Sequence, residues 1–148
     1  MSAVPGWTSS PLSDERGSVA LWLLGLCVML LFVGGLSLDL WRAFTERRAL
    51  AVAVDAAAVA GASGIDVDAF RATGAVVLDP AEAEALAAAN LAAQSGLDAL
   101  TGVTVSALPA AITVEATGAV ELTLTRMLLD AEPLPIRVAA TAEPHRSP

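Results

Sequence analysis

A run of 21 residues without a formally charged side chain, residues 18–38, constrains this chain more than any other feature of its sequence. As a helix the run is about 32 Å long, which matches the roughly 30 Å hydrocarbon layer of a bilayer. Trp22 and Trp41 stand about 28 Å apart along the same helix. Both indoles can therefore lie at membrane interfaces, where Trp is enriched. The pattern predicts a transmembrane helix over residues 18–38.

Two other interpretations of the run are weaker. A buried helix of a soluble protein would need apolar partners on every side, and nothing else in the chain is apolar enough to surround it. A cleaved secretory signal would need a basic flank and a small-residue cleavage site, but residues 13–17 are not basic and no A-x-A motif follows the run. The helix is therefore expected to remain as a membrane anchor.

The charges around the span leave its orientation open. Arg16 is the only base before it, whereas Arg42, Arg47 and Arg48 follow it, so the positive-inside rule favours a cytoplasmic C-terminal side. However, about 110 residues follow the span, and segments of that length cross membranes largely regardless of their charge. Charge counting alone therefore does not decide which side the C-terminal part occupies.

The region after the span, residues 39–63, is predicted to continue the helix as a stem. No proline interrupts it, and its residues are mostly strong helix formers. Ala53, Ala57 and Gly61 recur at every fourth position along the stem, a spacing that lets another helix approach closely. The high helix propensity of alanine explains the same residues equally well. Helix packing at this row is therefore one of two interpretations.

Four short motifs follow one another in a fixed order around and after the apolar run. They are Glu15-Arg16-Gly17 before the run, Gly35-Leu36-Ser37-Leu38-Asp39 with Arg42 at its exit, Arg47-Arg48-Ala49-Leu50, and Asp55-Ala56-Ala57-Ala58 followed by Ala60. The ordered combination, more than any single motif, carries a family resemblance. The N-terminal third of the chain resembles the N-terminal region of TadG-like and TadE-like proteins of the tight adherence (Flp) pilus system.

The resemblance implies a topology: residues 1–17 form a cytoplasmic leader, one helix anchors the protein in the bacterial cell membrane, and the C-terminal domain lies outside the cytoplasm. It also implies a candidate processing site between Gly17 and Ser18, because pilin-like members of such families are cut after a glycine. True pilins carry Glu five positions after the cut, where this sequence has Trp22, so it is more similar to TadG-like than to TadE-like proteins. The D-x-S-x-S metal motif of longer TadG-like proteins is absent from this sequence, and its binding activity is not implied here.

Residues 64–143 are predicted to form a small extracytoplasmic α+β domain. A helix is expected to begin after Asp79, a good N-cap, with Pro80 in its first position, and to end at Gly96. Residues 75–78 are predicted to form a short edge strand before this helix. Helical spacing places the inner face of the helix at Leu86, Ala89, Asn90, Ala93 and Leu97.

From Gly102 onward, apolar and polar residues alternate, which predicts three or four antiparallel strands with one apolar face. The apolar positions are Val103/Val105, Ile112/Val114, Val120/Leu122/Leu124 and Ile136/Val138/Ala140. Turns are expected at residues 108–110 and at Thr117-Gly118, and residues 132–135 separate the final strand. One helix packed on such a sheet, after a long N-terminal helix, gives a pilin-like α+β fold. Residues 144–148 are expected to form a flexible tail.

The composition argues against several classes of function. A net charge of −8 and a pI near 4.4 leave no basic face for nucleic-acid phosphates. Cys27 is a lone thiol inside the span, and His145 lies in a proline-bounded tail. The sequence contains no catalytic triad, metal-ligand cluster, P-loop or dinucleotide motif. It therefore predicts a protein that is not an enzyme, with no catalytic residue, cofactor, metal site or small-molecule substrate.

Two functions remain. The first is structural: a single-pass, TadG-like or pseudopilin-like component of Flp pilus assembly or a related secretion machine. Its partners would be the membrane and other pilus or secretion components, contacted through helix packing and the outer domain. The second is an extracytoplasmic binding module that is tethered to the membrane without joining a pilus. Co-purification from detergent separates the two, because only the first predicts other Tad components in the complex.

Overall fold

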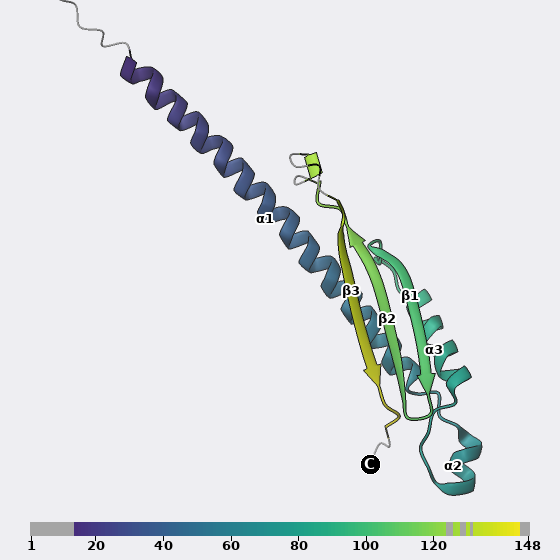
Figure 1. Ribbon diagram of the computed structural model, residues 1–148. Helices are drawn as coiled ribbons and strands as arrows, with labels where there is room; N and C mark the ends of the chain where they lie inside the picture. Colours follow the sequence, from purple (N-terminus) through teal and green to yellow (C-terminus); the bar gives the residue numbers. More distant parts are fainter. Residues whose placement is uncertain (1–13, 124–125, 128–129, 131, 146–148) are drawn as a thin grey trace, which may run out of the picture.

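The computed structural model describes residues 14–123, 126–127, 130 and 132–145. The first element in this part of the chain is a single long helix, α1 (Asp14–Gly61). Its 48 residues contain the predicted span and the predicted stem as far as Gly61 without a break, over a length of about 72 Å. The N-terminal half of α1 projects beyond the rest of the molecule, and the C-terminal half lies along the sheet (Figure 1). Most of the predicted leader and residues 146–148 of the predicted tail fall outside the described residues.

Three strands form one antiparallel sheet in the order β1-β2-β3. Their bounds are β1 (Leu100–Leu108), β2 (Ala111–Val120) and β3 (Leu134–Ala142). The tight turn expected at residues 108–110 joins β1 to β2. The apolar alternation of β2 is present, since Ile112, Val114 and Val120 are buried. The predicted α+β class is therefore confirmed, with three strands in the sheet.

The turn predicted at Thr117-Gly118 is wrong, because both residues lie inside β2 and pair with β1 and β3. A Cβ atom added to Gly118 would lie 2.6 Å from the carbonyl oxygen of Ala99. The glycine therefore permits a close approach of the backbone and does not reverse the chain. The strand expected to continue to Leu122 ends instead at Val120, and Leu124 falls outside the described residues.

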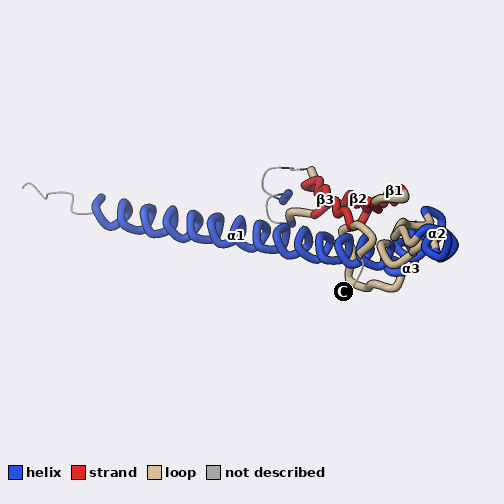
Figure 2. Tube along the Cα trace, turned by 90° about the horizontal axis from the view of Figure 1, so that it is seen from below, coloured by secondary structure: helices blue, strands red, loops and turns tan. Residues whose placement is uncertain are grey.

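The molecule has two layers, with helices α1 and α3 (Pro80–Ala92) on the same face of the sheet. α1 covers β2 and β3, whereas α3 lies over β1 (Figure 1). Figure 2 shows the strands along one side of the C-terminal half of α1. The stem of α1 thus supplies one wall of the core. The largest fully buried side chains of that core are Leu50, Val54, Leu78, Ile112 and Val114.

Helix α3 begins as predicted, because the Asp79 carboxylate caps it and Pro80 takes its first position. Asp79 Oδ1 accepts hydrogen bonds from the backbone N–H groups of Ala81 (2.9 Å) and Glu82 (3.3 Å). The helix ends at Ala92, and Gly96 adopts a positive φ of 78° in the turn beyond it.

The predicted inner face of α3 is wrong by about one position. The buried residues are Ala83, Ala87 and Leu91, whereas Ala89 and Ala93 are exposed. Ala83 and Ala87 lie beside Gly61 of α1, where the two helices are so close that only small side chains fit. This close approach sets which face of α3 is buried, and Leu91 lies one turn further along that face.

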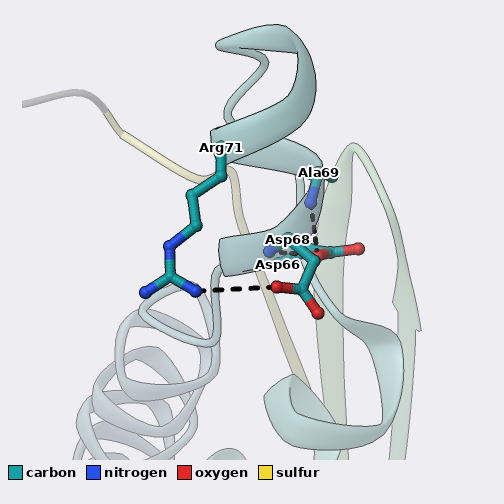
Figure 3. A network of polar contacts seen from close by, with 4 residues as sticks. All are labelled: Asp66, Asp68, Ala69 and Arg71. Carbon is teal, nitrogen blue, oxygen red and sulfur yellow. Dashed lines mark hydrogen bonds and ion pairs between the residues drawn. The ribbon is translucent and has the colours of Figure 1, made fainter.

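A short helix, α2 (Val67–Thr73), has no counterpart among the sequence predictions and lies at the end of the molecule far from the N-terminus (Figure 1). Asp66 caps it by accepting hydrogen bonds from the N–H groups of Asp68 (3.0 Å) and Ala69 (2.9 Å), as Figure 3 shows. Arg71 pairs with Asp68 at 3.7 Å on the exposed side. The edge strand predicted over residues 75–78 is wrong, since only an isolated bridge between Ile65 and Leu78 forms there.

Candidate membrane anchor and docking surfaces

The N-terminal half of α1 exposes apolar side chains around its whole circumference. Leu21 is 74% exposed and Leu31 is 77% exposed, although neither carries a polar atom beyond its backbone. Residues 17–61 form a helix that is long and apolar enough to cross a membrane, with a mean hydropathy of 2.6 in its most apolar window. Such a surface is stable in lipid or against other apolar helices, and unfavourable in water.

The predicted interface and processing residues all lie on this exposed half or at its end. Trp22 is 81% exposed and Trp41 is 69% exposed, so both indole rings are free to meet the surroundings of the helix. Gly17 and Ser18 lie near the start of α1, and both are exposed. An added Cβ at Gly17 would meet nothing within 4 Å. The rest of the described chain therefore covers none of these four residues.

Asp39, the first carboxylate after the apolar run, is turned towards the C-terminal domain and is only 5% exposed. Ala43 lies one helical turn further on the same face and forms a small apolar cluster with Val120 and Ile136. The other side of α1 at this level is apolar and exposed, with Leu40 and Trp41 on it. The rest of the protein therefore covers the Asp39 carboxylate, which does not face the surroundings of the helix.

The row Ala53, Ala57 and Gly61 packs against α3 of the same chain. Ala53 and Ala57 are buried, and a Cβ atom added to Gly61 would lie 2.8 Å from the carbonyl oxygen of Ala83. The Gln94 side-chain amide also donates a hydrogen bond to the Ala53 carbonyl oxygen at 3.2 Å, which ties the end of α3 to the stem. The small residues are thus used for close packing inside one chain.

A groove of about 580 Å³ lies between the exposed flank of α1 and the outer side of β3. α1 contributes Phe44, Arg47, Arg48 and Ala51, and β3 contributes residues 137–139. We call it the arginine groove, because Arg137 of β3 joins the two arginines of α1. Sequence reasoning missed it, since the basic residues are about 90 positions apart and only the packing of α1 on the sheet brings them together. No local signal in the sequence predicts this grouping.

Residues with chemical reactivity are sparse in the part of the chain that the structure describes. No group of three or more His, Cys, Asp or Glu side chains there could hold a metal ion. Cys27 is exposed on the apolar half of α1. Glu84 has a structural contact, because its Oε1 accepts a hydrogen bond from the backbone N–H of Ala107 at 3.0 Å. That contact fastens α3 to the end of β1.

Comparison with known families gives one match, over residues 17–64, to the Tad family model described as Flp pilus-assembly TadE/G-like. The matched segment covers about a third of the chain and coincides with the exposed span, the stem and the turn after it. No curated protein matches the chain, and no solved structure matches it. The resemblance seen in the sequence motifs is therefore confirmed: residues 17–64 match the family model of Flp pilus-assembly TadE/G-like proteins.

Proposed function

We propose that the protein is a non-enzymatic, single-pass membrane component of Flp pilus assembly or a related secretion machine, TadG-like or pseudopilin-like in character. One observation carries the proposal: the residues that match the TadE/G-like family are the same residues that form the uncovered apolar helix and its stem. Residues 18–38 lie in the bacterial cell membrane, with the N-terminus in the cytoplasm. The domain of residues 64–143 lies outside the cytoplasm and docks on other components.

The long helix suits this role mechanically. α1 crosses from its exposed apolar half into the core of the outer domain without a break. The domain is therefore fixed to the anchor by buried side chains, and no flexible linker separates them. A partner that binds the outer domain would be coupled directly to the membrane helix, which is useful in an assembly that has to transmit force or set the orientation of its subunits.

The topology is tested by paired reporter fusions. Alkaline phosphatase, which is active outside the cytoplasm, and green fluorescent protein, which fluoresces inside it, are each fused after Pro148 and before Ser18 in the full chain. We expect phosphatase activity only from the C-terminal fusion and fluorescence only from the N-terminal one. The opposite pattern would place the outer domain in the cytoplasm and end the proposal.

Assembly is tested by gentle detergent extraction and mass spectrometry of the proteins that co-purify with the chain. Other Tad components in stoichiometric amounts support a role in the pilus machine. A protein that purifies alone, while its outer domain retains a soluble ligand, would support the tethered binding module instead. The same preparation shows the mature N-terminus, since a chain that starts at Ser18 has been processed after Gly17 and a chain that starts at Met1 has not.

A further inference from the structure

The arginine groove follows the edge of the sheet. In a strand, successive side chains point to opposite faces. Three consecutive residues of β3, Arg137, Val138 and Ala139, line the groove, so it runs along the strand edge and includes both faces beside it. β3 is the last strand in the order β1-β2-β3, and among the described residues it pairs with β2 alone. The groove therefore offers backbone groups that another extended segment can pair with.

The charge of the groove is opposite to that of the chain as a whole. Three of the eight arginines gather in it, no acidic side chain lines it, and the net charge of the chain is −8. Within the described part of the chain, the ion pairs join Arg71 to Asp68 and Arg126 to Glu121, so the groove arginines take part in none of them. Phe44, which is 61% exposed, adds an apolar surface beside these charges.

The height of the groove above the membrane favours a protein over a lipid headgroup. Arg47 and Arg48 follow Leu38 by about 14–15 Å along the helix axis. The headgroup layer on one side of a bilayer is only about 5–8 Å deep. A helix tilt of about 40°, the upper end of the usual range, still leaves these arginines about 10 Å beyond the end of the span.

A second copy of this chain is a poor occupant. Two copies with a net charge of −8 each repel one another. The described carboxylates lie mainly on helices and loops, and Glu115 lies on the central strand, where both edges are already paired. The described part of the chain thus offers no free strand with alternating acidic residues.

We propose that the arginine groove binds an extended acidic segment of another protein, which adds to β3 as a fourth strand. Backbone pairing with β3 supplies affinity, and carboxylates of the segment meet Arg47, Arg48 and Arg137. Apolar residues of the segment lie on Phe44 and Val138. The proposal rests on the proposed function in one respect, because the span sets the height of the groove above the lipid.

The test uses the full chain in nonionic detergent and a fluorescein-labelled peptide of three Val-Glu-Glu repeats, which places Glu on both faces of a strand, followed by fluorescence anisotropy. A peptide of three Val-Lys-Lys repeats is the charge control. The groove variant reverses Arg47, Arg48 and Arg137 to Glu, and the matched variant reverses Arg42, Arg71 and Arg126, which changes the net charge equally. Thermal unfolding of both variants checks that they are folded.

We expect the Val-Glu-Glu peptide to bind and the Val-Lys-Lys peptide not to bind. The groove variant should lose at least tenfold in affinity, the matched variant should lose much less, and each single Arg→Ala change in the groove should cost about two- to fivefold. An acidic peptide N-methylated at every residue should fail to bind, because both of its edges are blocked, and hydrogen exchange within residues 134–142 should slow when the unmodified peptide is bound.

Several results would overturn the proposal. Equal losses in the two triple variants would mean that arginines anywhere on the surface, and not the groove, attract the peptide. Unchanged binding of the N-methylated peptide would exclude strand addition. Displacement of the peptide by phosphatidylglycerol added as mixed micelles would assign the groove to lipid, and dimerisation lost only in the groove variant would assign it to a second copy. The reporter fusions are read independently, so failure of the groove and failure of the membrane topology are distinguishable.

Discussion

At the scale of single residues, Gly61 allows the close approach of α1 to α3. A Cβ atom at this position would lie 2.8 Å from the Ala83 carbonyl oxygen and would also run into the Ile112 side chain. We expect Gly61→Ala to lower the free energy of unfolding by about 1–3 kcal/mol, because the helices must move apart to accept it. The measurement is thermal unfolding of the full chain in detergent.

The matched control for Gly61 is Gly25→Ala, also within α1. A Cβ atom there meets nothing within 4 Å, so this change should be neutral or slightly stabilising through helix propensity. If the two variants unfold alike, backbone proximity at Gly61 is not what holds α3 in place.

The two tryptophans at the ends of the span make a second prediction at the residue scale. In single-Trp variants reconstituted into bilayers, Trp22 and Trp41 should be quenched most by lipids brominated near the headgroup. A Trp placed at Leu31, midway between them and 77% exposed, should be quenched most by bromines near the chain ends. Similar depth profiles for all three positions would mean that α1 lies along the membrane surface.

At the scale of secondary structure, the start of α3 depends on one carboxylate. Asp79→Ala removes the acceptor for two backbone N–H groups and should lower the free energy of unfolding by about 1 kcal/mol. Asp55→Ala is the control, because Asp55 is exposed on the stem and lies at the start of the last two turns of α1, away from any helix N-terminus. Comparable losses in the two variants, measured by thermal unfolding, would show that charge removal and not capping causes the effect.

The stem has one buried face and one exposed face, and two adjacent alanines lie on different faces. Ala57 is fully buried between α1 and the rest of the core, whereas Ala56 is exposed. We expect Ala57→Leu to destabilise the protein by about 1–3 kcal/mol through overpacking, and Ala56→Leu to change its stability by less than about 0.5 kcal/mol. A destabilising Ala56→Leu in the purified monomer would show that the burial of this face has been misassigned.

At the scale of the whole molecule, the C-terminal domain depends on the stem for its core. Leu50, Val54, Ala57 and Ala58 of α1 belong to the same buried cluster as Ile112 and Val114 of the sheet. We therefore expect a fragment of residues 39–148 to unfold cooperatively, at a temperature that does not depend on protein concentration. A fragment of residues 64–148 should lack such a transition, because the inner face of its sheet is uncovered.

Leu50→Asp in the longer fragment is the control, since it keeps the stem but disrupts its buried face. It should resemble the shorter fragment in circular dichroism melts. A shorter fragment that melts as cooperatively and at the same temperature as the longer one would show that the sheet and α3 need no support from α1.

Some features of this protein are determined locally, and its sequence alone predicts them. The long helix follows from an uninterrupted run of apolar and helix-forming residues, and the start of α3 follows from Asp79 and Pro80. The inward positions of β2 follow from a period of two. In each case the cause lies within a few neighbouring residues, so no knowledge of distant contacts is needed.

Other features were decided only when distant parts of the chain packed together. Gly118 resembles a turn residue in the sequence, yet the backbone of Ala99 lies against it within the sheet. The buried face of α3, with Ala83, Ala87 and Leu91, is set by the close approach of this helix to Gly61. The arginine groove joins residues about 90 positions apart. Burial, close backbone approach and grouped charge depend on which surfaces meet, and that is a property of the tertiary structure alone.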